Sequence, residues 1–385
     1  MSGAHRLRGE IAIVGIAELA EPAGDRSPAG FMAEAARAAI LDAGVRKDQI
    51  DGLFTTTPYY YAPSLTFAEY FGLTPRYSDS TVIGGCSFEA YLGHAAAAIT
   101  AGLCDYALIA YGSTQRTDRG ALMSGSEWLE YERPYGMLHP ISPIGLIANR
   151  HMHEFGTTPE QFAQVAVAAR EWSARNPRAP HRDRVLTVDD VLGSPMISTP
   201  VHRLDCCLVT DGAAALVVTS AERARDLPND PVYVLGAGEA ADHRNITGMP
   251  DLTTTRARDS ARRAYEMAGL GPDDIDVAEV YDAFTMSLLV LLEDLGFCAK
   301  GEGGAFVESG AIRPGGALPL NTNGGGLSFV HPGMLGAFLL TEAVQQLRGS
   351  AGDRQVAGAR TALAHGMGFT LGGHASVVLG GADAL

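Results

Sequence analysis

A segment near the start of this chain returns 225 residues later. Residues 36–44 (ARAAILDAG) match residues 261–269 (ARRAYEMAG), and positions 48, 50 and 51 match positions 273, 275 and 276. In both copies small and apolar residues recur at helical spacing, a glycine follows as at a helix C-terminus, and a strand-like run comes next. Chance produces such matches in alanine-rich chains, but the constant offset favours two duplicated α/β halves.

A length of 385 residues exceeds one usual hydrophobic core and leaves room for both halves. We predict a first half over residues 1–220, a polar linker over 221–231 and a second half over 232–385. Apolar, β-branched runs predict buried strands at residues 11–15, 106–110, 213–219, 232–235 and 375–379. Residues 114–203 interrupt this rhythm with aromatic, proline and arginine residues and a helical stretch near 162–170, which predicts an inserted loop domain that covers a site.

Charge and composition exclude several classes of function. The net charge of −15 argues against binding to nucleic acid, whose phosphates attract clustered Lys and Arg. The chain contains no apolar run of about 18 residues of the kind that crosses a bilayer. No export signal is visible at the N-terminus, so we expect a cytoplasmic protein. The five cysteines form no C-x-x-C pair and the histidines show no metal-ligand spacing, which predicts reduced thiols and no metal in this chain.

Cys86 follows two glycines and precedes an alanine-rich stretch that predicts a helix ending near residue 102. We expect residues 80–83 to form a strand-like run, so that the cysteine falls at a strand-to-helix turn. The exposed N–H groups and the positive end of the helix dipole favour a thiolate there, and the thiolate is the nucleophilic form of a cysteine. The alternative is a small buried hydrophobic residue, which is the commoner role of a free cysteine.

Four segments, taken in order, resemble motifs of the thiolases. They are the Cys86 turn with residues 101–112, the run at 211–220, the tetrapeptide Tyr281-Asp282-Ala283-Phe284, and the loop at 324–332 that ends in His331-Pro332. Residues 295–298, 346–349 and 354–356 are similar to the sterol carrier protein X type and to bacterial lipid-transfer-protein-like thiolases. The resemblance covers nearly the whole chain and implies an α/β thiolase fold, with two duplicated halves forming a layered α-β-α-β-α core.

The resemblance also implies roles for individual residues. Cys86 would be the nucleophile, and His331 would activate it and hold the thioester oxygen. Tyr281 occupies the place of an Asn or His that supports the oxyanion hole, and its phenol can donate a hydrogen bond. His365 stands where biosynthetic thiolases carry their second cysteine, and Ala283 replaces the cysteine of the His-Asp-Cys-Phe variant, so the second proton transfer falls to His365, His331 or Tyr281.

The backbone N–H groups of Cys86, Gly366 and Gly368 would form the second oxyanion hole of such an enzyme. Phe329, Val330 and Met334 flank His331 and are candidates for an apolar substrate pocket, as are Trp128 and the tyrosines at positions 59–61. Each functional role has a structural alternative: a loop histidine satisfied by backbone hydrogen bonds for His331, and an aromatic side chain that only packs for Tyr281.

The expected function is that of a thiolase-like acyltransferase acting on acyl-CoA thioesters through a Cys86 acyl-enzyme, by 3-oxoacyl-CoA thiolysis or Claisen condensation. Coenzyme A would be substrate or product, with no cofactor bound covalently. Two alternatives stay open. One is a retro-aldol lyase that cleaves a β-hydroxyacyl-CoA side chain with tyrosine acid/base groups. The other is a non-catalytic scaffold that binds acyl-CoA or lipid.

The resemblance further implies partners. Thiolases dimerise through strands of the first half, which predicts a homodimer. Members of the lipid-transfer-like branch often pair with a small OB-fold, zinc-ribbon protein that helps to accept coenzyme A. This chain has neither a basic cluster nor zinc-ribbon cysteines of its own for that task, so we expect a second subunit in a heteromeric complex.

Overall fold

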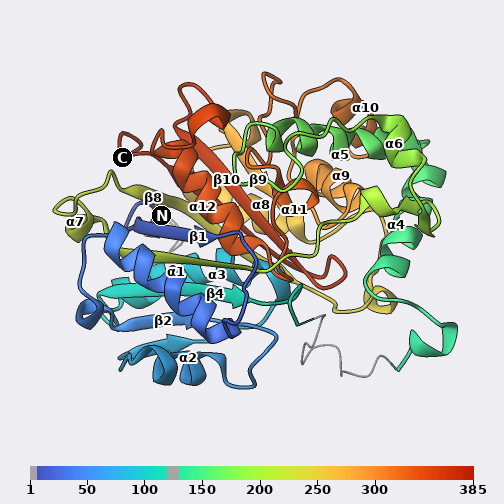
Figure 1. Cartoon of the computed structure of the whole chain (residues 1–385). Coiled ribbons are helices and arrows are strands. Elements are labelled where there is room, and N and C mark those ends of the chain that lie inside the picture. Colours follow the sequence, from blue (N-terminus) through green and yellow to red (C-terminus); the bar gives the residue numbers. More distant parts are fainter. Residues whose placement is uncertain (1–6, 119–129) are drawn as a thin grey trace.

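The computed structural model describes residues 7–118 and 130–385 of the protein (Figure 1). Its large sheet has nine strands in the order β3-β2-β4-β7-β1-β8-β11-β10-β9. The strands of this sheet are β1 Ile11–Leu19, β2 Gly52–Thr55, β3 Tyr77–Asp79, β4 Tyr106–Ser113, β7 Gly212–Ser220, β8 Val232–Ala241, β9 Val277–Val280, β10 Thr361–Gly368 and β11 Gly373–Gly380. All five runs predicted as buried strands are therefore strands of one sheet.

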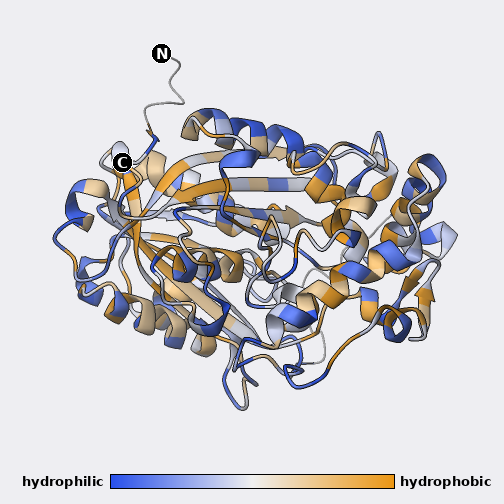
Figure 2. Ribbon diagram, turned by 90° about the horizontal axis from the view of Figure 1, so that it is seen from above, coloured by the Kyte–Doolittle hydropathy of each residue, from blue (hydrophilic) through white to orange (hydrophobic). Residues whose placement is uncertain are grey.

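The helices that surround this sheet come from both halves of the chain. They are α1 Pro28–Asp42, α2 Pro63–Phe71, α3 Ser87–Thr100, α7 Ala221–Ala224, α8 Ala257–Ala268, α9 Thr285–Asp294, α10 Gly303–Glu308, α11 Gly325–Ser328 and α12 Gly336–Leu347. In Figure 2 the peripheral helices carry apolar residues on one side and hydrophilic residues on the other, as expected for helices that cover a buried sheet.

The strand order repeats, which confirms the duplication. In the first half β2 is parallel to β4, β4 is antiparallel to β7, and β7 is antiparallel to β1. In the second half β9, β10, β11 and β8 follow one another with the same sequence of parallel and antiparallel pairings. The halves meet where β1 pairs antiparallel with β8 over two residue pairs, Ala12 with Tyr233 and Ile13 with Val232.

The offset of 225 recurs in the elements and in their hydrogen bonds. The short 3-10 helix η2 (Lys47–Gln49) corresponds to η8 (Pro272–Asp274), and β2 corresponds to β9. Asp51 precedes β2 and its Oδ1 accepts hydrogen bonds from the N–H groups of Asp105 (2.8 Å) and Tyr106 (2.9 Å). Asp276 precedes β9, and its Oδ2 accepts from the residues that begin β10. The matching aspartates therefore fix the start of the neighbouring parallel strand in each half, β4 and β10.

A glycine on the first strand of each half allows the outer helix to approach the sheet closely. A β-carbon on Gly15 would overlap the carbonyl oxygen of Ala39 in α1, and one on Gly236 would overlap the carbonyl oxygen of Ala264 in α8. Ala39 and Ala264 are themselves a pair in the repeat. The contact needs glycine on the strand because even a β-carbon there would meet the backbone of the helix.

Two helices lie in the middle of the molecule. α3 and α12 each contact strands from both halves and also contact one another, whereas α1 packs on β1, β4 and β7 and α8 packs on β8 and β11. The first-half and second-half strands of the sheet therefore lie on either side of α3 and α12, with α1 and α8 outside them, which confirms the predicted α-β-α-β-α core. In this arrangement the start of α3, where Cys86 lies, is enclosed at the junction of the halves.

The segment predicted as an inserted loop domain is mainly helical where it is described. It contains η5 Arg133–Tyr135, α4 Ile141–Phe155, α5 Pro159–Ser173, α6 Val188–Leu192 and the small hairpin of β5 Met196–Ser198 with β6 Val201–His202. α5 packs against α9, α10 and α11, which brings the segment onto the loops of the second half. Trp128 lies outside the described residues. Among those described, no helix combines the length and apolar character that crossing a bilayer requires.

Candidate functional site

Cys86 ends the 3-10 helix η3 (Gly84–Cys86) and directly precedes α3. The preceding residues 80–83 do not form the strand-like run that we predicted, because β3 already ends at Asp79. The Asp79 carboxylate accepts hydrogen bonds from the N–H and hydroxyl groups of Thr81, both at 2.7 Å, and this turn replaces the pairing that a strand would need.

The thiol of Cys86 is enclosed. The residue has no exposed surface, it packs against Ala90 and Ala375, and its Sγ donates a hydrogen bond to the carbonyl oxygen of Ile83 at 3.1 Å. Burial raises the pKa of the Cys86 thiol well above its ordinary value, and the neighbouring carboxylate of Glu89 raises it further. The start of the helix was expected to favour a thiolate, but loss of solvent outweighs that effect here.

Tyr281 connects the Cys86 turn to His331. Its hydroxyl lies 3.1 Å from Nε2 of His331 and accepts a hydrogen bond from the N–H of Leu335 at 3.3 Å. A β-carbon on Gly85, next to Cys86, would lie 2.7 Å from the same hydroxyl oxygen. The sequence therefore identified residues that the fold brings together from η3, from the end of β9 and from the loop before α12.

His331 is held in place by the backbone of a neighbouring loop. Its N–H donates to Oγ1 of Thr210 at 3.0 Å, and its carbonyl oxygen accepts from the N–H of Thr210 at 3.3 Å. Burial lowers the pKa of the imidazole to about 4. The ring is therefore neutral near neutral pH, which leaves one nitrogen free to accept a proton and the other to donate a hydrogen bond.

Asp282 supports the loop that carries His331. Its carboxylate accepts hydrogen bonds from the N–H groups of Gly326 (2.7 Å) and Leu327 (3.2 Å) in α11. Gly325 has a φ of +58°, and a β-carbon there would overlap the Asp282 carboxylate. The carboxylate thus fixes a tight glycine turn a few residues before His331.

His365 is buried in a chain of polar groups. Its Nδ1 lies 2.8 Å from the hydroxyl of Ser376, and its Nε2 lies 3.4 Å from Nδ1 of His374. Burial lowers the pKa of His365 well below its ordinary value, and His374 adds to that effect. The carbonyl oxygen of His365 accepts a hydrogen bond from the N–H of Tyr281 at 3.0 Å. His365 therefore contacts Tyr281 through its main chain, while its ring contacts Ser376 and His374.

Gly366 and Gly368 lie against the Cys86 turn. A β-carbon on Gly366 would lie 2.6 Å from Cα of Cys86, and one on Gly368 would overlap the carbonyl oxygen of Ile83. The absence of side chains allows β10 to approach the start of α3 backbone to backbone. The oxyanion hole expected from the N–H groups of Cys86, Gly366 and Gly368 stays a prediction.

The candidate pocket residues next to His331 belong to the hydrophobic core. Phe329, Val330 and Met334 are all buried. The tyrosines of the first half are more exposed: Tyr61 projects into solvent, while the Tyr60 hydroxyl accepts a hydrogen bond from the N–H of Ala29 at 3.1 Å. Within residues 7–118 and 130–385, no group of three or more His, Cys, Asp or Glu side chains could hold a metal ion.

Glu89 is the residue at this site that sequence reasoning missed. It lies one helical turn after Cys86, has no exposed surface, and neither of its carboxylate oxygens has a hydrogen-bond partner among the described residues. Burial raises its pKa to about 8. A charged residue in the first turn of an otherwise apolar, alanine-rich helix was the available signal.

Comparisons with known proteins agree with this architecture. The family model described as "Thiolase C-terminal domain-like" matches residues 238–381. An acetyl-CoA acetyltransferase from Methanothermobacter thermautotrophicus is 36% identical over 384 residues, which cover 96% of this chain and 98% of that protein. Sterol carrier protein 2 of Oryctolagus cuniculus is 37% identical over 257 residues, or 64% of this chain and 46% of that protein.

A solved structure of an "Ltp2-ChsH2(DUF35) aldolase" superimposes with a TM-score of 0.88. The two chains are 32% identical, and the alignment covers 98% of this chain and 99% of the other. Identity of this extent over nearly the full length, together with the duplicated sheet, establishes the family. The chain belongs to the thiolase superfamily, in the branch that resembles sterol carrier protein X.

Proposed function

We propose that the protein breaks or forms the Cα–Cβ bond of acyl-CoA thioesters that carry an oxygen on Cβ, as a thiolase-like acyltransferase with Cys86 as its acyl acceptor. The observation that carries this proposal is the position of the Tyr281 hydroxyl, 3.1 Å from Nε2 of His331 and beside the backbone of the Cys86 turn. One hydroxyl thus links a nucleophile segment to a neutral imidazole, which is the arrangement that proton transfer at a thioester needs.

In thiolysis the Cys86 sulfur attacks the C3 carbonyl carbon of a 3-oxoacyl-CoA after its proton passes to His331. The C2–C3 bond then breaks, and the shortened acyl-CoA leaves as an enolate that takes a proton from the His331 and Tyr281 pair. The N–H groups of Cys86, Gly366 and Gly368 would hold the oxygen of the acyl group on Cys86. The thiol of free coenzyme A then loses its proton, attacks the acyl group and releases Cys86.

The second candidate is a retro-aldol lyase, and a specific observation favours it. The chain has Ala283 and His365 where relatives use a second cysteine, and the thiol of Cys86 is buried with a raised pKa. A lyase needs no acyl-enzyme: the Tyr281 and His331 pair would take the proton of a β-hydroxyl, the C2–C3 bond would break, and the enolate of the shorter acyl-CoA would be protonated. The superimposed structure is named as an aldolase, which supports this alternative.

One experiment separates the two reactions. The protein is incubated with 3-oxoacyl-CoA substrates in the absence of free coenzyme A, and its intact mass is measured. We expect an acyl adduct on the wild-type chain and none on Cys86→Ser. Release of an aldehyde or ketone from 3-hydroxyacyl-CoA substrates by both chains, with no adduct on either, would instead support the lyase and refute acyl transfer through Cys86.

The assembly and the location are part of the same proposal. We propose a homodimer in the cytoplasm that works with a small OB-fold, zinc-ribbon partner, and that holds neither a metal nor a covalently bound cofactor in this chain. The superimposed aldolase carries a DUF35 protein in its name, which supports a heteromeric partner. Light scattering of the purified chain, alone and with candidate partners, tests the assembly: a monomer with full activity and full affinity for coenzyme A would refute it.

A further inference from the structure

Glu89 occupies a space that glycines of two backbone segments leave for it. A β-carbon on Gly336, at the start of α12, would overlap Oε2 of Glu89, and so would a β-carbon on Gly366 in β10. The same β-carbon on Gly366 would lie 2.6 Å from Cα of Cys86. The carboxyl group and the Cys86 turn therefore border the same glycine, and both glycines are needed to make room for the carboxyl group.

The Glu89 carboxyl group has no partner that would fix its charge. Both oxygens are buried and neither makes a hydrogen bond within the described residues, although an unpaired buried carboxylate is costly. Protonation removes that cost, and burial accordingly raises the pKa of Glu89 to about 8. At neutral pH the group is therefore mainly an uncharged acid that can donate a hydrogen bond.

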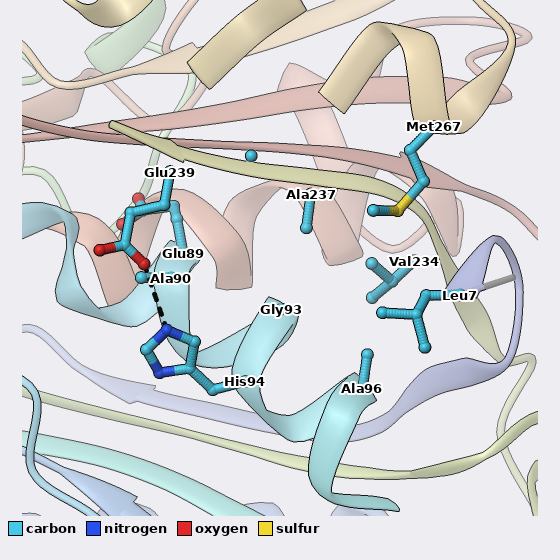
Figure 3. Close-up of a pocket in the computed structure, with 11 residues that line it drawn as sticks. Leu7, Glu89, Ala90, Gly93, His94, Ala96, Val234, Ala237, Glu239 and Met267 are labelled. Carbon is cyan, nitrogen blue, oxygen red and sulfur yellow. Dashed lines mark hydrogen bonds and ion pairs between the residues drawn. The ribbon is translucent and has the colours of Figure 1, made fainter. Parts of the chain in front are cut away.

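The titratable groups around Glu89 are few. Cys86 lies on η3 and Tyr281 follows β9, and the pKa of each is raised in part by the charge of Glu89. Glu239 on β8 and His94 on α3 line a cavity of about 210 Å³ whose wall includes Glu89 (Figure 3). In that view the His94 ring is paired with Glu239, so it neutralises that carboxylate rather than Glu89.

The residues of α12 and β10 that lie against Glu89 are the glycines Gly336 and Gly366. His365 is next to Gly366 in β10, but successive side chains of a strand point to opposite faces. The His365 ring is instead hydrogen-bonded to the hydroxyl of Ser376. Within the described structure, therefore, no basic side chain faces the Glu89 carboxyl group from these elements, and Cys86 is the nucleophilic side chain beside it.

We propose that Glu89 is a positioning residue that acts on Cys86 through its charge: in its protonated form it places no second negative charge near the thiolate. This inference rests on the proposed role of Cys86 as acyl acceptor. When His331 takes the Cys86 proton, a neutral Glu89 carboxyl group adds no second negative charge near the new thiolate. When Glu89 ionises, a second negative charge opposes the thiolate, and the nucleophile is suppressed.

The test is a titration of the Cys86 thiolate by its ultraviolet absorbance, with Cys86→Ser in the same background subtracted to remove the other cysteines. Glu89→Gln keeps the shape of the protonated carboxyl group and cannot ionise. We expect its Cys86 titration midpoint to fall by about one pH unit or more relative to wild type, which is the shift that a like charge at close range produces. Glu239→Gln is the matched control, and its midpoint should move less.

Activity gives the second readout. We expect adduct formation on wild-type Cys86 to decline above about pH 8, where Glu89 ionises. In Glu89→Gln adduct formation should persist without this decline. Glu89→Asp keeps an ionisable group and should retain the decline. An unchanged thiolate midpoint in folded Glu89→Gln, or adduct formation that still declines above about pH 8 in this variant, would overturn the inference.

The inference and the proposed function can fail separately. The titration needs no substrate, so a shifted midpoint in Glu89→Gln without any acyl adduct on wild type would refute acyl transfer through Cys86 and leave the Glu89 effect standing. An adduct on wild type with identical midpoints in both chains would refute the Glu89 inference alone. If Glu89→Gln does not fold, the same comparison is made with Glu89→Met, which cannot ionise either and whose midpoint should also fall.

Discussion

Replacing Tyr281 by Phe removes one hydroxyl and leaves the ring in place. In the wild-type protein this oxygen lies 3.1 Å from Nε2 of His331 and accepts a hydrogen bond from the N–H of Leu335 at 3.3 Å. All these groups are buried, so water does not replace the lost partner. Because a buried polar group left unsatisfied costs about 1–3 kcal/mol, two of them predict a loss of roughly 2–6 kcal/mol in the free energy of unfolding.

The same substitution removes a proton-transfer group from the site. We expect the rate of Cα–Cβ cleavage to fall by about 10²- to 10⁴-fold, the usual contribution of one positioned acid or base. Urea denaturation measures the stability and single-turnover cleavage measures the chemistry. Tyr265→Phe in α8 is the matched control: the Tyr265 hydroxyl donates to the carbonyl oxygen of Leu295, directly after α9, at 3.2 Å.

We expect Tyr265→Phe to lose about 1 kcal/mol of stability, the net value of one such hydrogen bond, and no catalytic rate. Tyr281→Phe should lose both stability and cleavage rate, because its hydroxyl serves Tyr281 and His331 as a pair. A Tyr281→Phe variant within about 0.5 kcal/mol of wild type, the scatter of ordinary surface substitutions, and with unchanged cleavage would refute the role that we give to this hydroxyl.

Two further predictions concern the contacts between halves and within them. Asp79 and Glu239 raise the pKa of His94 from 6.5 to about 9. The stability from its charged form is therefore fully present below about pH 6.5 and is lost as the pH rises through 9. In His94→Gln the free energy of unfolding, measured with urea between these pH values, should lose this dependence on pH. An unchanged dependence would contradict the prediction. Gly15→Ala and Gly236→Ala force a β-carbon into the backbone of the outer helix, and each should lower the melting temperature by a similar amount, for a cost of about 1–3 kcal/mol. A large difference between the two variants would contradict the equivalence of the halves.

The sequence alone was sufficient for the fold because its signals are local and repeated. The offset of 225 residues marks the same helix, the same short turn and the same strand in each half, and the apolar runs marked five strands of the sheet. Cys86, Tyr281 and His331 could also be selected in advance, because glycine turns and motif order accompany each of them. Their proximity followed from the duplicated fold and not from their spacing along the chain.

Tertiary structure decided how these groups ionise. The start of a helix predicted a stabilised thiolate at Cys86, but the layers of both halves close over it and burial raises its pKa. Residues 80–83 have the pattern of a strand, but in the folded chain the Asp79 side chain binds Thr81 and a turn forms instead. Glu89 was an ordinary first-turn glutamate in the sequence. It became an unpaired acid beside the nucleophile because α12 and β10, which are distant in the chain, present glycines there. Sequence periodicity determines which residues are inside, whereas the charge they carry depends on neighbours that only the folded chain brings together.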